Sequence, residues 1–138
     1  MKNKNNSLRL WPWLILFAML GGIFMLSTGA FTAEATGKIF GPYNNLARKF
    51  AHVSEYAVLF IGMRWVFGRT TNKLGGTALS LIALLLCVLY AGSDEWHQLF
   101  VPGRTSSLFD VALDSCGAAF GCVVWSVCQW TRKLRKRT

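Results

Sequence analysis

Four long apolar runs constrain the fold of this chain more than any other feature of its sequence. They cover about residues 10–28, 47–67, 75–92 and 108–130, and each approaches the roughly 20 residues that a helix needs to cross a lipid bilayer. A water-soluble domain of 138 residues would need a charged outer surface, whereas most of the charge here lies between or beside the runs. The sequence therefore predicts an all-α membrane protein, in which about four transmembrane helices form a compact antiparallel bundle.

The length of the chain leaves room for one domain, so we expect a single membrane domain over residues 1–138. The short connection at residues 69–74 is typical of two antiparallel neighbouring helices. The first run has a second interpretation, because a basic start, an apolar stretch and the small-residue pattern Ala33-Glu34-Ala35 also fit a secretory signal peptide. Whether the first helix is retained stays open at this point, and its removal would leave the topology of the other helices unchanged.

The basic residues predict how the bundle is oriented. With both termini in the cytoplasm, eleven Lys and Arg residues lie at the inner side and four at the outer side, which is the bias expected of a multi-pass protein of the bacterial plasma membrane. The formal net charge of +9 is concentrated at the two chain ends, where it favours contact with anionic lipid over nucleic acid. The four outer basic residues are Lys38, Arg48, Lys49 and Arg104.

Five of the six acidic residues lie in three short stretches that this topology places at the outer end of the bundle. Ionisable groups at membrane depth cost about 2.5–3.5 kcal/mol each on insertion scales, so they tend to be paired and functional. We therefore expect one polar site at the outer end. Its acidic members are Glu55, Asp94, Glu95, Asp110 and Asp114.

The spacing of the polar residues supports such a site. In the second run, four polar residues recur at positions i, i+4, i+7 and i+8 and so share one helix face, namely Arg48, His52, Glu55 and Tyr56. After the third run, a helical backbone would align Asp94 with His97 and Gln98.

The fourth run combines carboxylates with small residues. Asp110 and Asp114 fall on the same stripe as Gly117 and Gly121, which form a GxxxG motif. Small residues let a neighbouring helix approach closely. This stripe therefore predicts that the two carboxylates are pressed against the other polar stripes.

Each part of the expected site also has a purely structural interpretation. Residues 107–110 match a capping box, so Asp110 could serve only to satisfy free amides at a helix start. Asp94 and Glu95 could be solvated loop charges, and the outer basic residues could anchor lipid headgroups.

Three motifs carry a resemblance to a known family. They are His52-x-x-Glu55-Tyr56, then Ser93-Asp94-Glu95-x-His97-Gln98-x-Phe100-Val101-Pro102-Gly103-Arg104, and Asp110-x-x-x-Asp114-x-x-Gly117-x-x-x-Gly121. Over about residues 46–125 the chain resembles the VanZ-like family, which is named for an accessory glycopeptide-resistance protein associated with teicoplanin. The resemblance implies a role in the cell envelope, but no settled reaction. The family usually has Asn where this chain has Asp114.

Two main functions remain open on the sequence. In the first, the outer site binds an amphiphile, such as a lipid-linked cell-wall precursor or a lipoglycopeptide. Basic residues would hold phosphate or carboxylate groups of this ligand. The expected binding residues are Arg48, Lys49, His97, Gln98, Arg104 and Asp114.

In the second, the protein is a membrane-embedded hydrolase or transferase that acts on a lipid-linked substrate by acid/base catalysis. The expected catalytic residues are His52, Glu55, Asp94, Glu95 and Asp110. A variant of this hypothesis adds a divalent metal held by some of the same side chains, although no ligand motif identifies one. A proton-coupled transporter is a third alternative, but it lacks a polar trail across the bundle.

Overall fold

A computed structural model of the chain describes residues 10–27, 33–101 and 106–137, and within these ranges every regular element is helical. The elements are α1 (Trp11–Met25), α2 (Ala33–Phe40), the 3₁₀ turn η3 (Gly41–Tyr43), α3 (Asn44–Thr70), α4 (Gly76–Gln98) and α5 (Leu108–Arg135). The all-helical fold that the sequence predicts is thus confirmed. The number of helices that cross a membrane and their orientation stay predictions.

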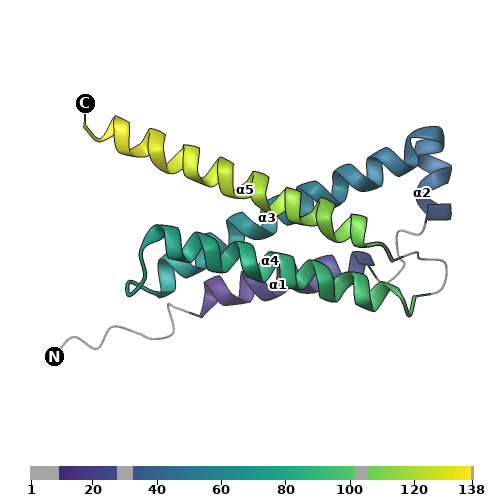
Figure 1. Ribbon diagram of the computed structural model, residues 1–138, viewed down its shortest axis with the longest axis horizontal. Helices are drawn as coiled ribbons and strands as arrows, with labels where there is room; N and C mark the ends of the chain where they lie inside the picture. The colour runs from purple at the N-terminus through teal and green to yellow at the C-terminus, as the bar shows by residue number, and fades with distance from the viewer. Residues whose placement is uncertain (1–9, 28–32, 102–105, 138) are drawn as a thin grey trace.

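The four long helices alternate in direction (Figure 1). The start of α1, the connection between α3 and α4, and the end of α5 lie at one end of the bundle. Helix α2 and the start of α5 lie at the other end, which we call the α2 end. Helices α3 and α5 cross, and α4 packs against both of them.

Several helix boundaries differ from the expected ones. Helix α4 continues to Gln98, because Gln98 and Asp94 are one turn apart and their side chains are hydrogen-bonded, which stabilises the polar last turn. Helix α5 continues to Arg135, since basic residues in a last turn interact favourably with the helix dipole. Residues 33–43, expected to form a connection, fold into α2 and η3.

The GxxxG motif brings α5 into backbone contact with α3, as the sequence predicts. A Cβ atom added to Gly117 would lie 2.9 Å from Cα of Val53, and one added to Gly121 would lie 3.0 Å from Cα of Ala57. Only glycine fits at such distances. Asp114, one turn before Gly117, is thereby held against α3 and is fully buried.

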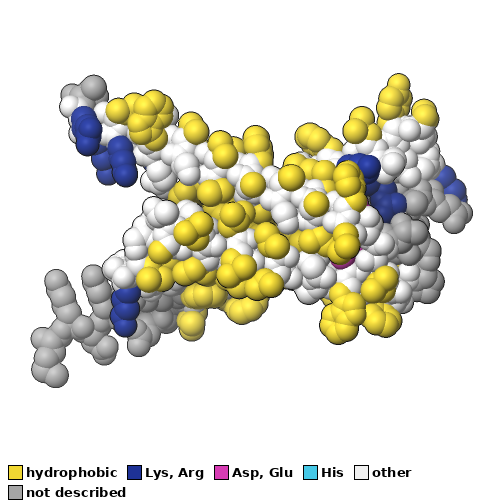
Figure 2. All heavy atoms as spheres, in the orientation of Figure 1, with side chains coloured by type: hydrophobic (Ala, Val, Ile, Leu, Met, Phe, Trp, Pro, Cys, Tyr) yellow, Lys and Arg dark blue, Asp and Glu magenta, His cyan; other side chains and the backbone are white. Residues whose placement is uncertain are grey.

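Helices α4 and α5 are, among the described residues, the ones that are both long and apolar enough to cross a membrane. Only 22% of the apolar stretch of each is buried within the bundle, whereas the core helix of a soluble protein would be mostly buried. Apolar side chains cover much of the face shown in Figure 2, and Lys and Arg gather near the ends of the bundle.

Candidate functional site

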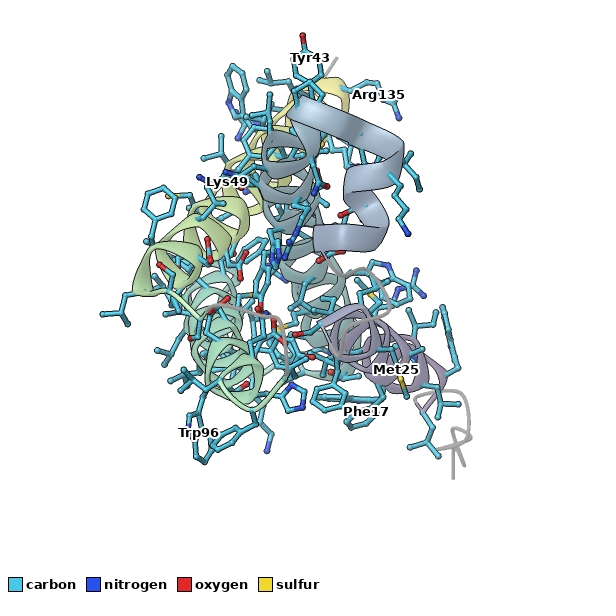
Figure 3. The ribbon with its side chains drawn as sticks, turned by 90° about the vertical axis from the view of Figure 1, so that its right-hand side faces the viewer. Phe17, Met25, Tyr43, Lys49, Trp96 and Arg135 are labelled. Carbon is cyan, nitrogen blue, oxygen red and sulfur yellow. The ribbon has the colours of Figure 1, made fainter. Side chains whose placement is uncertain are left out.

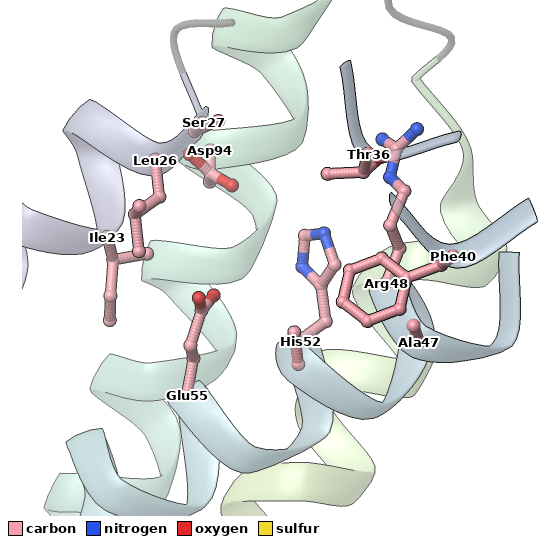
Figure 4. A pocket seen from close by; sticks show the side chains of 11 residues that line it. Ile23, Leu26, Ser27, Thr36, Phe40, Ala47, Arg48, His52, Glu55 and Asp94 are labelled. Atoms are coloured by element: carbon pink, nitrogen blue, oxygen red, sulfur yellow. The ribbon is translucent and has the colours of Figure 1, made fainter. Parts of the chain in front are cut away.

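A cavity of about 310 Å³ opens at the α2 end, between the last turn of α1, α2, α3 and α4 (Figure 4). We call it the His52 cavity. One part of its wall is charged or polar and consists of Arg48, His52, Glu55 and Asp94. Another part is apolar and consists of Ile23, Leu26, Phe40, Ala47 and Ala51. Charged and apolar side chains alternate around the cavity (Figure 4).

The polar wall follows from helix periodicity and from the extension of α4. Arg48, His52 and Glu55 lie on successive turns of one face of α3, as their spacing predicts. Asp94 reaches the cavity from the last turns of α4 and is only 3% exposed. Its Oδ2 atom accepts a hydrogen bond of 3.0 Å from Nε2 of Gln98, while its Oδ1 atom has no hydrogen-bond partner among the described residues.

Behind the cavity wall, His52 faces a buried carboxylate. Nδ1 of His52 lies 3.3 Å from Oδ1 of Asp114, close enough for an ion pair but outside hydrogen-bond geometry. The Asp114 side chain is fully buried, because the GxxxG stripe presses this part of α5 onto α3. With Nδ1 directed at Asp114, Nε2 is the ring nitrogen left for a ligand in the cavity.

Glu95 and Asp110 do not line the cavity. Oε2 of Glu95 accepts a hydrogen bond of 2.9 Å from the amide of Ser107, which is the N-cap of α5. The Ser107 hydroxyl in turn accepts a hydrogen bond from the amide of Phe109. In a capping box, Asp110 would accept a hydrogen bond from the amide of Ser107. Glu95 accepts that hydrogen bond instead, so the capping box that the sequence suggests forms only in part. This contact gives Glu95 a structural role.

Other residues of the expected site also point elsewhere. Nζ of Lys49 lies 4.9 Å from the centre of the Phe109 ring, on the α5 side of the bundle (Figure 3). The His97 ring lies 4.6 Å from the Phe24 ring, in a separate hollow next to the exposed side chain of Trp96. Arg104 lies outside the described residues.

Sequence reasoning missed part of the cavity. Ser27 and Thr36 line it, and the buried hydroxyl of Tyr56 has no hydrogen-bond partner among the described residues. Tyr56 itself does not line the cavity, and its spacing already places it in the polar stripe of α3. No local pattern shows that the end of α1 folds over this stripe.

The donor set of the cavity bears on the metal hypothesis. Within the part of the chain that the structure describes, no group of three or more His, Cys, Asp or Glu side chains is placed to hold a metal ion. The arrangement offers instead an imidazole with a buried carboxylate behind it, a guanidinium group and two further carboxylates. Such groups can bind a polar headgroup or transfer protons.

The fold and the cavity define a class: a helical membrane protein with a charged pocket near one end of its bundle. The model of the VanZ/LLP1 family matches residues 1–129, and the chain therefore belongs to this family. No curated protein and no solved structure matches the chain.

Proposed function

We propose that this VanZ-like protein binds an amphiphile in the His52 cavity and thereby acts in the cell envelope, in resistance to glycopeptides of the teicoplanin type. The ligand is a lipid-linked wall precursor or a lipoglycopeptide at the outer leaflet of a bacterial plasma membrane, which the protein crosses several times. The observation that carries the proposal is that charged and apolar side chains line the same cavity.

The size and charges of the cavity support an amphiphile. Its volume of about 310 Å³ is at the lower end of small-molecule sites, which span roughly 300–1,000 Å³. It can hold a headgroup and the start of an acyl chain, while the rest of the ligand lies outside. Arg48 would pair with a phosphate or carboxylate. Glu55 and Asp94 would accept hydrogen bonds from hydroxyl or ammonium groups of the same headgroup.

Direct binding tests this proposal. The full-length protein in lipid nanodiscs is titrated with an acylated glycopeptide and with the same glycopeptide lacking the acyl chain. We expect binding of the acylated form, and a loss of about tenfold in affinity for Arg48→Gln, because a charge-assisted contact is removed. Lys49→Gln is the matched control, since Lys49 contacts Phe109 away from the cavity. Equal affinity for both glycopeptides would argue against an amphiphile site.

The contact between His52 and Asp114 favours a second candidate function, acid/base catalysis on a lipid-linked substrate. A carboxylate behind an imidazole fixes its orientation and stabilises its protonated form, so that Nε2 can act as a general base. Comparison of membrane lipids from wild-type, deletion and His52→Gln cells separates the two functions. An enzyme predicts the same accumulating lipid in the deletion and in His52→Gln, whereas a binding protein predicts no change in lipid species.

A further inference from the structure

A second cavity, of about 660 Å³, lies at the opposite end of the bundle between α3, α4 and α5. We call it the Arg64 cavity. Arg64 is only 9% exposed although it carries a charge. Among the described residues, no acidic side chain lines this cavity. Burying a guanidinium without a counter-charge costs free energy, and an anionic ligand in the cavity would offset this cost.

The protein holds the Arg64 side chain in one place. Its Nε atom donates a hydrogen bond of 3.1 Å to the Ser80 hydroxyl, and its guanidinium lies 5.2 Å from the centre of the Trp125 ring. A Cβ added to Gly68 would lie 3.0 Å from Nη1, and one added to Gly76 would lie 3.3 Å from Nη2. The two glycines therefore leave the space that the guanidinium fills.

The start of α4 adds further donors to the same cavity. Its N-cap residue, Gly75, offers no side-chain cap, and the amide of Leu79 is the first to bond back to Gly75, at 3.1 Å. The amides of the first turn precede this bond, and such free amides at a helix start favour anions. Gly76 and Thr77 of this turn line the cavity. The helix start and the buried arginine thus point to the same kind of ligand.

Helix α5 completes the polar wall with Ser126, Gln129 and Lys133. Gln129 and Lys133 can donate hydrogen bonds to a ligand, whereas the Ser126 hydroxyl donates to the Cys122 carbonyl at 2.8 Å. The remaining wall, from Leu81, Leu84 and Trp125, is apolar. Two positive charges, neutral donors and an apolar border fit a phosphate group attached to a lipid.

The depth of the cavity agrees with a lipid headgroup. Five of the six tryptophans belong to the helix segments at this end, namely Trp11, Trp13, Trp65, Trp125 and Trp130. Tryptophan gathers at the level of lipid headgroups.

From these contacts we propose that the Arg64 cavity is a binding site for a phosphate group, in the form of an anionic phospholipid headgroup at the side of the membrane where α1 begins and α5 ends. The phosphate lies between the guanidinium of Arg64, the first turn of α4 and Lys133. This site is independent of the His52 cavity and of its proposed ligand.

Native mass spectrometry of the full-length protein tests the proposal. The protein in detergent is offered phosphatidylglycerol, diacylglycerol with the same acyl chains, and inorganic phosphate. We expect phosphatidylglycerol to be retained in preference to diacylglycerol. If inorganic phosphate displaces the lipid, the phosphate group alone is sufficient for binding. If it does not, the acyl chains of the lipid are also needed.

Variants locate the bound lipid. Arg64→Met should lower retention of phosphatidylglycerol at least about tenfold, because it removes a buried charge-assisted contact. Lys133→Gln, at an exposed position, should lower it about two- to fivefold. Arg132→Gln removes the same charge next to the cavity but does not line it, and should leave retention unchanged. Equal retention of both lipids by the wild type, or a Lys133→Gln protein that equals Arg132→Gln, would overturn the proposal.

Discussion

At the scale of single residues, the contact between His52 and Asp114 is the feature that most needs explanation. Burying a carboxylate is costly unless it is paired, and Asp114 is fully buried with His52 at 3.3 Å. The contact joins α3 to α5 and fixes which ring nitrogen of His52 is turned away from the cavity. Asp114 is therefore best understood as a residue that positions His52, and it does not reach the ligand itself.

This role predicts different effects for two substitutions of Asp114. Asp114→Asn should keep activity, because its amide oxygen can take the place of Oδ1 beside Nδ1 of His52. Asp114→Leu should cost about 1–3 kcal/mol of stability, because it removes the carboxylate that faces the buried Nδ1 of His52. Thermal unfolding measures the change in stability, and teicoplanin susceptibility at equal expression measures activity. If Asp114→Asn is as damaging as Asp94→Asn, the charge of Asp114 takes part in function.

At the scale of helices, the crossing of α3 and α5 holds the candidate site together. It depends on two glycines that face the backbone of α3. The same crossing places Asp114 behind His52, so packing and site geometry have one cause. The start of α5 is fixed separately, by the hydrogen bond from Ser107 to Glu95.

Glycine substitutions test this crossing. Gly117→Ala should destabilise the protein by about 1–3 kcal/mol, because the new methyl group would overlap the backbone of α3. Gly92→Ala is the matched control: nothing lies within 4 Å of the Cβ it would add in α4, so it should be neutral or stabilise by about 0.5–1 kcal/mol. Thermal unfolding in detergent measures the difference. Equal melting temperatures would mean that the close crossing does not exist.

The parts of the site that could be predicted from the sequence are those that depend on a single helix or on a local motif. Arg48, His52 and Glu55 belong to one helix, so their common face follows from periodicity alone. The GxxxG motif likewise predicts that a neighbouring helix packs closely against α5. Which of the neighbours Asp94 and Glu95 faces the cavity depends on the rotation of α4 within the bundle, and no local pattern encodes it. The large apolar side chains of the lining, Ile23, Leu26 and Phe40, come from α2 and the end of α1, whose positions depend on tertiary packing.

At the scale of the whole molecule, charge and aromatic residues are divided between the two ends. Acidic side chains gather toward the α2 end, where Glu55 and Asp94 line the His52 cavity. The opposite end has the buried Arg64, most of the tryptophans and the basic last turn of α5. This division agrees with a protein that crosses a membrane with its α2 end outside.

Cysteine labelling tests this orientation. In a background without the four native cysteines, a cysteine is placed at Asn45, at the α2 end, or at Asn72, in the connection between α3 and α4. A membrane-impermeant thiol reagent applied to intact cells should label position 45 and spare position 72. The reverse pattern would mean that the His52 cavity opens to the cytoplasm.

Filling the His52 cavity without removing any of its charges tests the account most directly. Ala51 lines the cavity, so Ala51→Trp should block it and leave Arg48, His52, Glu55 and Asp94 in place. The matched control is Ala112→Trp on the exposed face of α5, outside the cavity. Binding of the acylated glycopeptide, measured at equal thermal stability, should be lost in Ala51→Trp and kept in Ala112→Trp. Wild-type binding by Ala51→Trp would show that the cavity is not the site of action.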